Sequence, residues 1–244
     1  MMEFDQYGDP RLHTVVMLHG AAATDTFANQ YVLSEKYHLV IPHLSGAGRA
    51  VASPYDPKRE VEALTELIRS LGKEKVSLIG HSLGGELAVA LVTEHPELFD
   101  RAAFLSAWVC STPKSIRLYA RLARGTYFML RWSWLIRLQG KYWGYTDAQA
   151  AEMARYSALI PRETYVAWFQ KRVVLDELPG YAGVTIPMIA VCGERETREM
   201  KQSIAELGRR NPHCQTIRLR GASHDFPMRK VKEVNELLQH FLEA

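Results

Sequence analysis

The sequence predicts an α/β protein with a mostly parallel sheet that is interrupted by a helical insertion. Short apolar runs bounded by glycine and proline alternate with longer amphipathic segments, as expected for strands and helices that alternate along a parallel sheet. The alternation stops between residues 111 and 182 and then resumes. The length of 244 residues suits one large α/β domain and does not by itself require a second.

Six short apolar runs are typical of strands that are buried on both faces of a parallel sheet. They are residues 15–18, 39–41, 76–79, 102–105, 188–191 and 216–219. Four longer segments are expected to be helices, because their apolar residues recur at helical spacing or because they are rich in Leu, Ala and Val. They are residues 58–71, 83–95, 198–209 and 229–242.

The stretch that breaks the alternation is predicted to form several helices between two strands of the sheet. We therefore divide the chain into a core, residues 1–110 and 183–244, and a cap segment, residues 111–182. The cap segment holds four of the five tryptophans and seven of the eleven tyrosines. A strand is not expected within it.

Composition and charge favour an ordinary globular protein, with 47% hydrophobic and 23% charged residues. The net charge of +3 is too small to indicate a nucleic-acid partner, and none is expected. The first ten residues and the lengths of the apolar stretches predict neither a secretory signal nor a transmembrane helix. Cys110, Cys192 and Cys214 are odd in number and far apart, which indicates free thiols in a reducing cytoplasm and predicts a cytoplasmic location.

The strongest motif is G-x-S-x-G, formed by Gly80-His81-Ser82-Leu83-Gly84 directly after a strand run and directly before a helical segment. The chain must turn sharply here, and the flanking glycines let neighbouring backbone pass without a Cβ clash. The turn exposes the hydroxyl of Ser82, which is the predicted nucleophile. The amide of Leu83 then lies at a helix N-terminus, where it can donate to a developing oxyanion.

A serine hydroxyl needs a general base at neutral pH, and the chain order expected for this architecture is serine, acid, histidine. His224 follows the last strand run and precedes the C-terminal helix, so it is the predicted base. The acid should follow residues 188–191. We favour Glu196, where the loop has turned out from the sheet, and keep Glu194 as the alternative, which is closer to the strand end.

The second oxyanion donor should come from the loop after residues 15–18. This loop contains Gly20, which permits a turn, followed by three alanines. The amide of Ala21 is the preferred donor, with that of Ala22 as the alternative. The small side chains leave room for an acyl group beside the nucleophile.

From Leu18–Gly20 through Gly80–Gly85 to Gly221–His224, the sequence resembles the serine hydrolases of the α/β-hydrolase family, carboxylesterases among them. The resemblance spans nearly the whole chain. It implies the α/β-hydrolase fold, with a sheet of about eight strands and a helical cap over the active site. Two departures stand out, because Glu196 occupies the acid position where aspartate is commoner and His43 stands near a place where relatives often have aspartate.

These residues predict hydrolysis of a carboxylic ester, a lactone or a thioester of a small apolar molecule, without a metal or an organic cofactor. Serine at position 82 argues against dehalogenase or epoxide hydrolase chemistry, which in this fold uses a carboxylate nucleophile. Two alternatives remain open. The same triad can serve acyl transfer or perhydrolysis, and the fold can also serve a ligand-binding signalling protein with little turnover.

The cap segment carries seven basic residues and no Asp or Glu between residues 111 and 146. They are Lys114, Arg117, Arg121, Arg124, Arg131, Arg137 and Lys141. Three interpretations compete: a solvated basic face over an apolar face packed on the sheet, an aromatic-lined pocket, and weak interfacial contact with anionic lipid without stable insertion. His81, Trp108, Trp132 and Trp134 are the candidate substrate-binding residues, and Trp108 could equally belong to the core. The sequence does not determine an oligomeric state.

Overall fold

The computed structural model describes residues 2–244 and contains a seven-stranded sheet in the order β1-β3-β2-β4-β5-β6-β7. The strands are β1 (Phe4–Tyr7), β2 (Thr14–Leu18), β3 (His38–Pro42), β4 (Val76–His81), β5 (Phe99–Leu105), β6 (Met188–Gly193) and β7 (Cys214–Leu219). All neighbouring strands pair in parallel except β1, which pairs antiparallel with β3 at one edge. This confirms the predicted mostly parallel sheet, with a strand count close to the expected eight.

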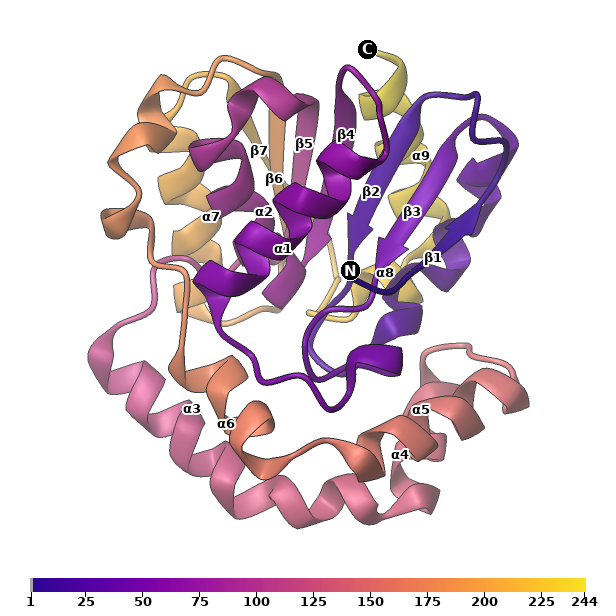
Figure 1. Ribbon diagram of the computed structural model, residues 1–244. Helices are drawn as coiled ribbons and strands as arrows, with labels where there is room; N and C mark the ends of the chain where they lie inside the picture. Colours follow the sequence, from indigo (N-terminus) through magenta and orange to yellow (C-terminus); the bar gives the residue numbers. More distant parts are fainter. Residues whose placement is uncertain (1) are drawn as a thin grey trace.

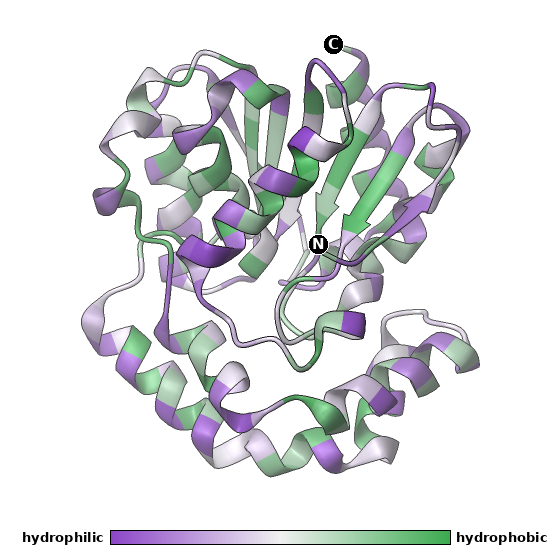
Figure 2. Ribbon diagram, viewed as in Figure 1, coloured by the Kyte–Doolittle hydropathy of each residue, from purple (hydrophilic) through white to green (hydrophobic). Residues whose placement is uncertain are grey.

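The central strands are buried on both faces, as their continuous apolar sequences predicted. Every residue of β2, β3, β4 and β6 is buried, and these strands are rich in Val, Ile and Leu. Figure 2 shows hydrophobic residues along the middle of the sheet. Such strands need helices on both sides, because a parallel sheet buries both of its faces.

Helices cover both faces of the sheet (Figure 1). One face packs against α1 (Pro57–Ser70), α2 (Leu83–Glu94) and α7 (Arg198–Arg210). The other packs against the 3₁₀-rich segment η1 (Thr24–Glu35), the short α8 (Phe226–Arg229) and α9 (Val231–Glu243). Short 3₁₀ turns lie at η2 (Gly48–Ala50) and η3 (Pro96–Leu98). The four helices expected in the core therefore form within two residues of their predicted starts.

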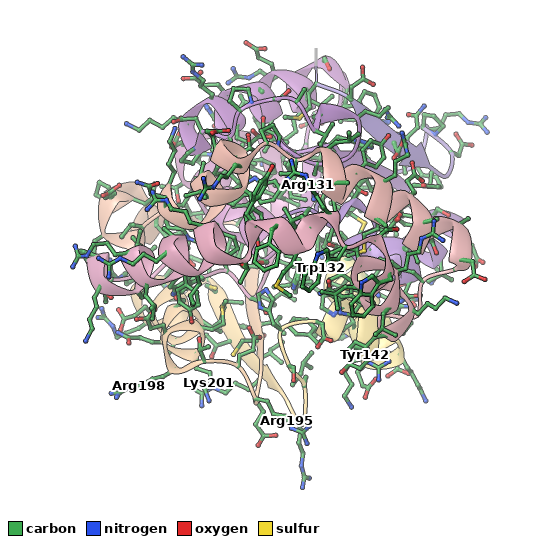
Figure 3. The ribbon with its side chains drawn as sticks, turned by 90° about the horizontal axis from the view of Figure 1, so that it is seen from below. Arg131, Trp132, Tyr142, Arg195, Arg198 and Lys201 are labelled. Carbon is green, nitrogen blue, oxygen red and sulfur yellow. The ribbon has the colours of Figure 1, made fainter. Side chains whose placement is uncertain are left out.

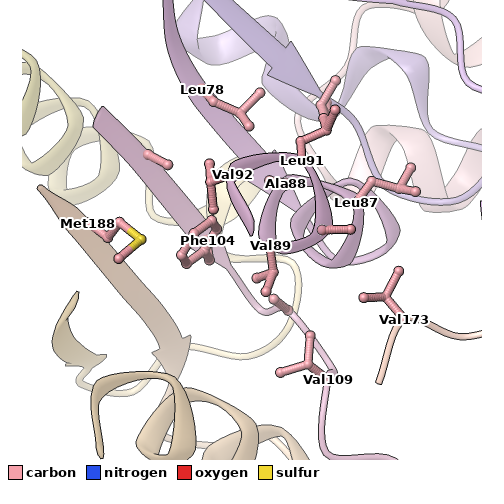
Figure 4. Close-up of a cluster of buried hydrophobic side chains, with 14 of the residues drawn as sticks. Leu78, Leu87, Ala88, Val89, Leu91, Val92, Phe104, Val109, Val173 and Met188 are labelled. Atoms are coloured by element: carbon pink, nitrogen blue, oxygen red, sulfur yellow. The ribbon is translucent and has the colours of Figure 1, made fainter. Parts of the chain in front are cut away.

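Helix α2, which follows the predicted nucleophile, is the best-buried helix of the core. It is buried because it packs directly on the middle of the sheet. Its residues Leu87, Val89 and Val92 lie in one cluster with Phe104 of β5 and Met188 of β6 (Figure 4). This packing holds the start of α2 at the carboxyl edge of the strands.

The chain between β5 and β6 is helical, and its helices α3 to α6 cover the carboxyl ends of the strands (Figure 1). Its elements are α3 (Pro113–Thr126), η4 (Tyr127–Arg131), α4 (Ser133–Tyr142), α5 (Asp147–Leu159), α6 (Arg162–Gln170), η5 (Leu175–Glu177) and η6 (Pro179–Gly183). Helix α3 packs along α6, and α4 packs along α5. The two connections to the sheet meet where the amide of Leu175 donates to the carbonyl of Val109 at 2.9 Å.

Among the helices of residues 2–244, none combines enough length with enough apolar sequence to cross a membrane.

Candidate active site

Ser82 lies at the sharp turn between β4 and α2. Its backbone has φ 54° and ψ −116°, a left-handed conformation that costs a non-glycine residue energy. The amide of Ser82 donates to the carbonyl of Leu105 at 2.8 Å, which anchors the turn to the neighbouring strand. Gly84 is required on the other side, because a Cβ there would collide with the carbonyl of Leu18. The turn therefore presents the serine hydroxyl at the carboxyl edge of the sheet.

His224 and Glu196 meet Ser82 in one hydrogen-bonded chain. Nε2 of His224 lies 2.9 Å from Oγ of Ser82, and Nδ1 lies 2.8 Å from Oε2 of Glu196. Glu196 comes from the loop after β6, and His224 comes from the loop after β7. A carboxylate next to Nδ1 favours the tautomer with the proton on that nitrogen, so Nε2 is free to accept the serine proton.

The carboxylate of Glu196 is buried and held by two further donors. Its Oε1 accepts hydrogen bonds from the amide of Gly193 at 2.7 Å and from the hydroxyl of Ser106 at 2.8 Å. Burial by itself would raise the pKa of Glu196. The hydrogen bond and charge of His224, together with these two donors, outweigh burial and bring this pKa below its usual range. The carboxylate is therefore kept ionised next to the imidazole.

Ser106 is a site residue that the sequence analysis missed. It directly follows β5, has φ 51° and is fully buried. A lone serine after a strand carries no motif. Its relation to Glu196 becomes visible only because β5 pairs with β6, which places the two strand ends side by side.

Glu194, the alternative acid, takes a different place. Its side chain is exposed, and its Oε2 accepts from the amide of Gly221 at 2.7 Å. It therefore holds the turn that begins the His224 loop. The structure brings Glu196, and not Glu194, to the imidazole.

Of the two predicted oxyanion donors, Leu83 directly follows Ser82, and Ala21 packs against the hydrophobic cluster that contains Leu83. Leu83 is the first residue of α2, where an amide has no intrahelical acceptor, and Ala21 follows the end of β2. Within residues 2–244, neither amide has a hydrogen-bond acceptor. Thr26 fixes the loop that carries Ala21, because its hydroxyl accepts from the amide of Gly20 at 3.1 Å. Both amides are therefore available for a developing oxyanion.

A cavity of about 400 Å³ opens beside the hydroxyl of Ser82. It is lined by Ser82, Trp108, Tyr119, Phe169, Arg172, Arg195, Glu196, Thr197, Met200, Ser223 and His224. Trp108 is both a core residue and a wall of this cavity, with Tyr119 edge-on to its ring at 4.9 Å between centroids. The wall combines aromatic side chains with a rim of polar groups, a common composition for a small-molecule site.

Sequence comparison gives the family. The model of the family described as "Alpha/beta hydrolase family" matches residues 15–237. The chain belongs to this family. The match takes in β2, the turn at Ser82, the whole cap segment and the loop of His224.

Individual relatives of this family member are distant in sequence. A putative carbamate hydrolase RutD from a Caulobacter species is 27% identical over 45% of the chain and 43% of that protein's length. A putative RutD from Serratia proteamaculans is 22% identical over 96% of the chain and 92% of its own length. The matched region thus spans less than half the length of the first of these relatives.

Solved structures resemble the chain in fold. The enol-lactonase from Burkholderia xenovorans has a TM-score of 0.82 at 18% identity, over 100% of this chain and 96% of that chain. A carboxylesterase structure from Nitrososphaera gargenis has a TM-score of 0.79 at 17% identity, over 99% and 94%. At such identities the likeness shows the fold.

His81 and two tryptophans do not line the cavity, although the sequence predicted them as substrate-binding residues. His81 is buried beneath the site, with Nε2 2.9 Å from the backbone carbonyl of His224, and burial lowers its pKa to about 3. It supports the His224 loop from below and is not a wall of the cavity. Trp132 and Trp134 are 42% and 65% exposed and do not line the cavity either. Helix α4 turns Ile136 inward, so Trp134 faces outward.

A buried ion pair supports the cavity wall. Arg172 pairs with Glu86 of α2, and both side chains are almost completely excluded from solvent. The guanidinium lies 4.4 Å from the ring centroid of Trp108 and donates to the carbonyl of Trp168 at 2.9 Å. Burial lowers the pKa of Arg172 to about 10. The pair therefore ties the end of the cap segment to α2, the helix that follows Ser82.

His43, the other departure from the family pattern, lies away from the cavity. Its Nε2 is 2.8 Å from Oδ2 of Asp5, and its Nδ1 accepts from the amide of Arg49 at 2.8 Å. Arg49 in turn donates to Oδ1 of Asp5 at 2.8 Å. These contacts join the edge strand β1 to the loop after β3, so His43 organises loop packing at this edge of the sheet.

Proposed function

We propose that this hydrolase cleaves a carboxylic ester, a lactone or a thioester through an acyl-enzyme on Ser82. The observation that carries the proposal is the hydrogen-bonded chain from Ser82 through His224 to Glu196, with distances of 2.9 and 2.8 Å. A serine in this arrangement has a base within reach, and a buried acid orients that base.

The mechanism follows from this geometry. His224 takes the proton of the Ser82 hydroxyl as Oγ attacks the substrate carbonyl, and Glu196 stabilises the imidazolium that forms. The amides of Ala21 and Leu83 bind the oxyanion of the tetrahedral intermediate. His224 then gives its proton to the leaving alcohol or thiol. In the second half, His224 activates water, which releases the acid and restores the serine.

The cavity supports a small substrate with an apolar part. Trp108, Tyr119, Phe169 and Met200 offer apolar surface, and a cavity of about 400 Å³ is at the lower end of the sizes that hold small molecules. The names of the similar proteins support an ester and a lactone and add a carbamate as a further candidate. All three have a carbonyl that a serine can attack.

Access of water favours hydrolysis over acyl transfer. The side chain of His224 is 49% exposed, so solvent can reach the imidazole that would activate it. An acyltransferase or a perhydrolase would need to keep bulk water from the acyl-enzyme.

We place the reaction in the cytoplasm, in line with the free thiols of Cys110, Cys192 and Cys214.

The test is a panel of p-nitrophenyl esters of increasing acyl length, with a lactone and a carbamate beside them. We expect a burst of p-nitrophenol followed by steady turnover, and labelling of Ser82 by a fluorophosphonate, located by peptide mass spectrometry. Both should be lost in Ser82→Ala. A Ser82→Ala variant that keeps its activity, or a wild-type protein that the probe does not label, would refute the nucleophile. Labelling without turnover would instead indicate a binding protein.

A further inference from the structure

The outer face of the cap segment exposes an unusual amount of apolar surface. Ten large hydrophobic side chains are exposed in residues 2–244, and eight of them belong to the cap segment. Single exposed hydrophobic residues are normal, but a concentration on one element indicates a contact surface. The catalytic mechanism uses none of these eight side chains.

Helix α4 carries three of these exposed apolar side chains along one side. Trp134, Leu138 and Tyr142 follow one another at four-residue spacing and are 65%, 58% and 58% exposed. The buried residues of the helix are Ile136 and Gly140, which lie on the side toward the rest of the cap. The helix therefore has an apolar stripe that faces solvent in addition to the one that packs inward.

Helix α3 and the η4 turn continue this surface. Leu118 and Leu122 are exposed one turn apart on α3, and Phe128 and Trp132 are exposed in and just after η4. In Figure 1, α3 and α4 form the layer of the cap that lies farthest from the sheet, with α6 and α5 between them and the core. We call the exposed side of α3, η4 and α4 the outer cap face. Figure 3 looks at it directly and labels Trp132 and Tyr142 on it.

The charge on the outer cap face has one sign. Residues 111–146 hold seven Lys and Arg and no Asp or Glu, whereas the rest of the chain holds 23 Lys and Arg against 27 Asp and Glu. Arg117 and Arg121 adjoin Leu118 and Leu122 on α3, and Arg137 lies beside Leu138 on α4. These three arginines are exposed and make no ion pair within the described part of the chain. The molecule is thus polarised, with its positive charge next to exposed tryptophans.

We propose that the outer cap face docks on an anionic lipid bilayer, with α3 and α4 lying in the plane of the interface. Arginine side chains beside an apolar stripe can reach lipid phosphates while the stripe enters the headgroup region. Tryptophan and tyrosine are the side chains that prefer this depth. The negative remainder of the chain is repelled by the same surface, which orients the molecule.

Docking in this way places the catalytic cavity next to the membrane. Tyr119 of α3 and Arg195 of the loop after β6 both line the cavity. Figure 3 shows Arg195, Arg198 and Lys201 along one edge of the same view of the molecule. The cavity is thus lined both by α3, which carries part of the outer cap face, and by Arg195 of this second basic edge.

The first test is flotation of the protein with vesicles of phosphatidylcholine alone or in an equimolar mixture with phosphatidylglycerol. We expect binding to the mixed vesicles only, and weaker binding as salt is raised. The triple variant Arg117→Gln/Arg121→Gln/Arg137→Gln should lower the partition coefficient by about a hundredfold.

The matched control removes the same charge from the core surface. Lys58, Arg59 and Lys75 are exposed outside the cap segment, and their triple change to glutamine should leave vesicle binding near the wild-type value. Equal losses in the two triple variants would show that net charge alone drives binding and would overturn the proposal. Equal binding to neutral and mixed vesicles would overturn it too.

The second test uses tryptophan fluorescence with the double variant Trp132→Ala/Trp134→Ala. Both side chains are exposed and outside the catalytic cavity, so folding and basal ester hydrolysis should be unchanged. We expect mixed vesicles to shift the emission of the wild type to shorter wavelength and to leave that of the double variant unchanged. No shift in the wild type would contradict the proposal. If the wild type formed a dimer without lipid and the double variant were monomeric, the face would be assigned to contact with a second copy of the chain instead.

Discussion

The hydroxyl of Ser106 lies 2.8 Å from Oε1 of Glu196, on the side of the carboxylate opposite to His224. Ser106 does not touch the nucleophile or the cavity, so it acts on the reaction through Glu196. We expect Ser106→Ala to lower kcat by about ten- to a hundredfold with little change in KM, because a hydrogen bond to a charged group is worth about 1.5–3 kcal/mol. Steady-state kinetics with the best ester of the panel measures this split.

Ser111→Ala is the control for that variant. The hydroxyl of Ser111 is also buried, but it has no hydrogen-bond partner among residues 2–244. Its removal should leave kcat near the wild-type value. If Ser106→Ala changed only the melting temperature, with kcat intact, Ser106 would be structural and not a positioning residue.

The two glutamates of the loop after β6 give a second prediction. Glu196→Gln removes the negative charge next to Nδ1 of His224 and should lower kcat/KM by about 10³- to 10⁴-fold. Glu194→Gln keeps an oxygen that can accept from the Gly221 amide, so kcat/KM should remain close to wild type. Purified variants with matched circular dichroism spectra allow the comparison. A large loss in Glu194→Gln and none in Glu196→Gln would reverse the assignment of the acid.

Stability should fall in mild acid because two buried histidines must stay neutral. Burial lowers the pKa of His19 to about 4 and that of His81 to about 3. An unfolded histidine titrates near 6.5, so the contribution of each is complete above pH 6.5 and is lost as pH falls toward the folded value. Between pH 6.5 and 4, His81→Gln should reduce the slope of unfolding free energy against pH by about 1.4 kcal/mol per unit. Urea titrations across this range would show it, and an unchanged slope would contradict it.

The buried pair of Arg172 and Glu86 gives a fourth prediction. Glu86→Ala leaves a guanidinium buried without its partner and should lower the free energy of unfolding by about 3–5 kcal/mol. Its neighbour Lys171 pairs with Asp56 at 3.0 Å on the surface, and Lys171→Ala should cost less than about 1 kcal/mol. Urea denaturation distinguishes the two. A similar small cost for both variants would show that the buried pair contributes no more than the exposed one.

The sequence predicted those parts of the site that are encoded locally. Ser82 sits in a pattern of glycines that only a strand-to-helix turn requires, and the chain order of the family then pointed to His224 and Glu196. The four core helices and the central strands were predicted for the same reason, because elements with buried faces carry apolar residues in a regular pattern along the sequence.

Features that depend on tertiary neighbours were missed. Strand β1 contains Asp5 and Gln6 and is only half buried, since it pairs on one side at the sheet edge, so no apolar run marks it. Ser106 depends on the pairing of β5 with β6. Trp132 and Trp134 were expected in the pocket because aromatic residues favour pockets, but the orientation of α4 is set by which side packs on α5.

The backbone hydrogen bond between Leu175 and Val109 closes the neck of the cap segment. Because β5 and β6 are paired neighbours, everything between the two sides of this neck is an excursion that displaces no strand. Another set of helices could therefore be spliced in at the neck while the serine, the histidine and the acid keep their positions. Substrate choice and docking would be exchanged as one module, and the hydrolytic machinery would be inherited unchanged.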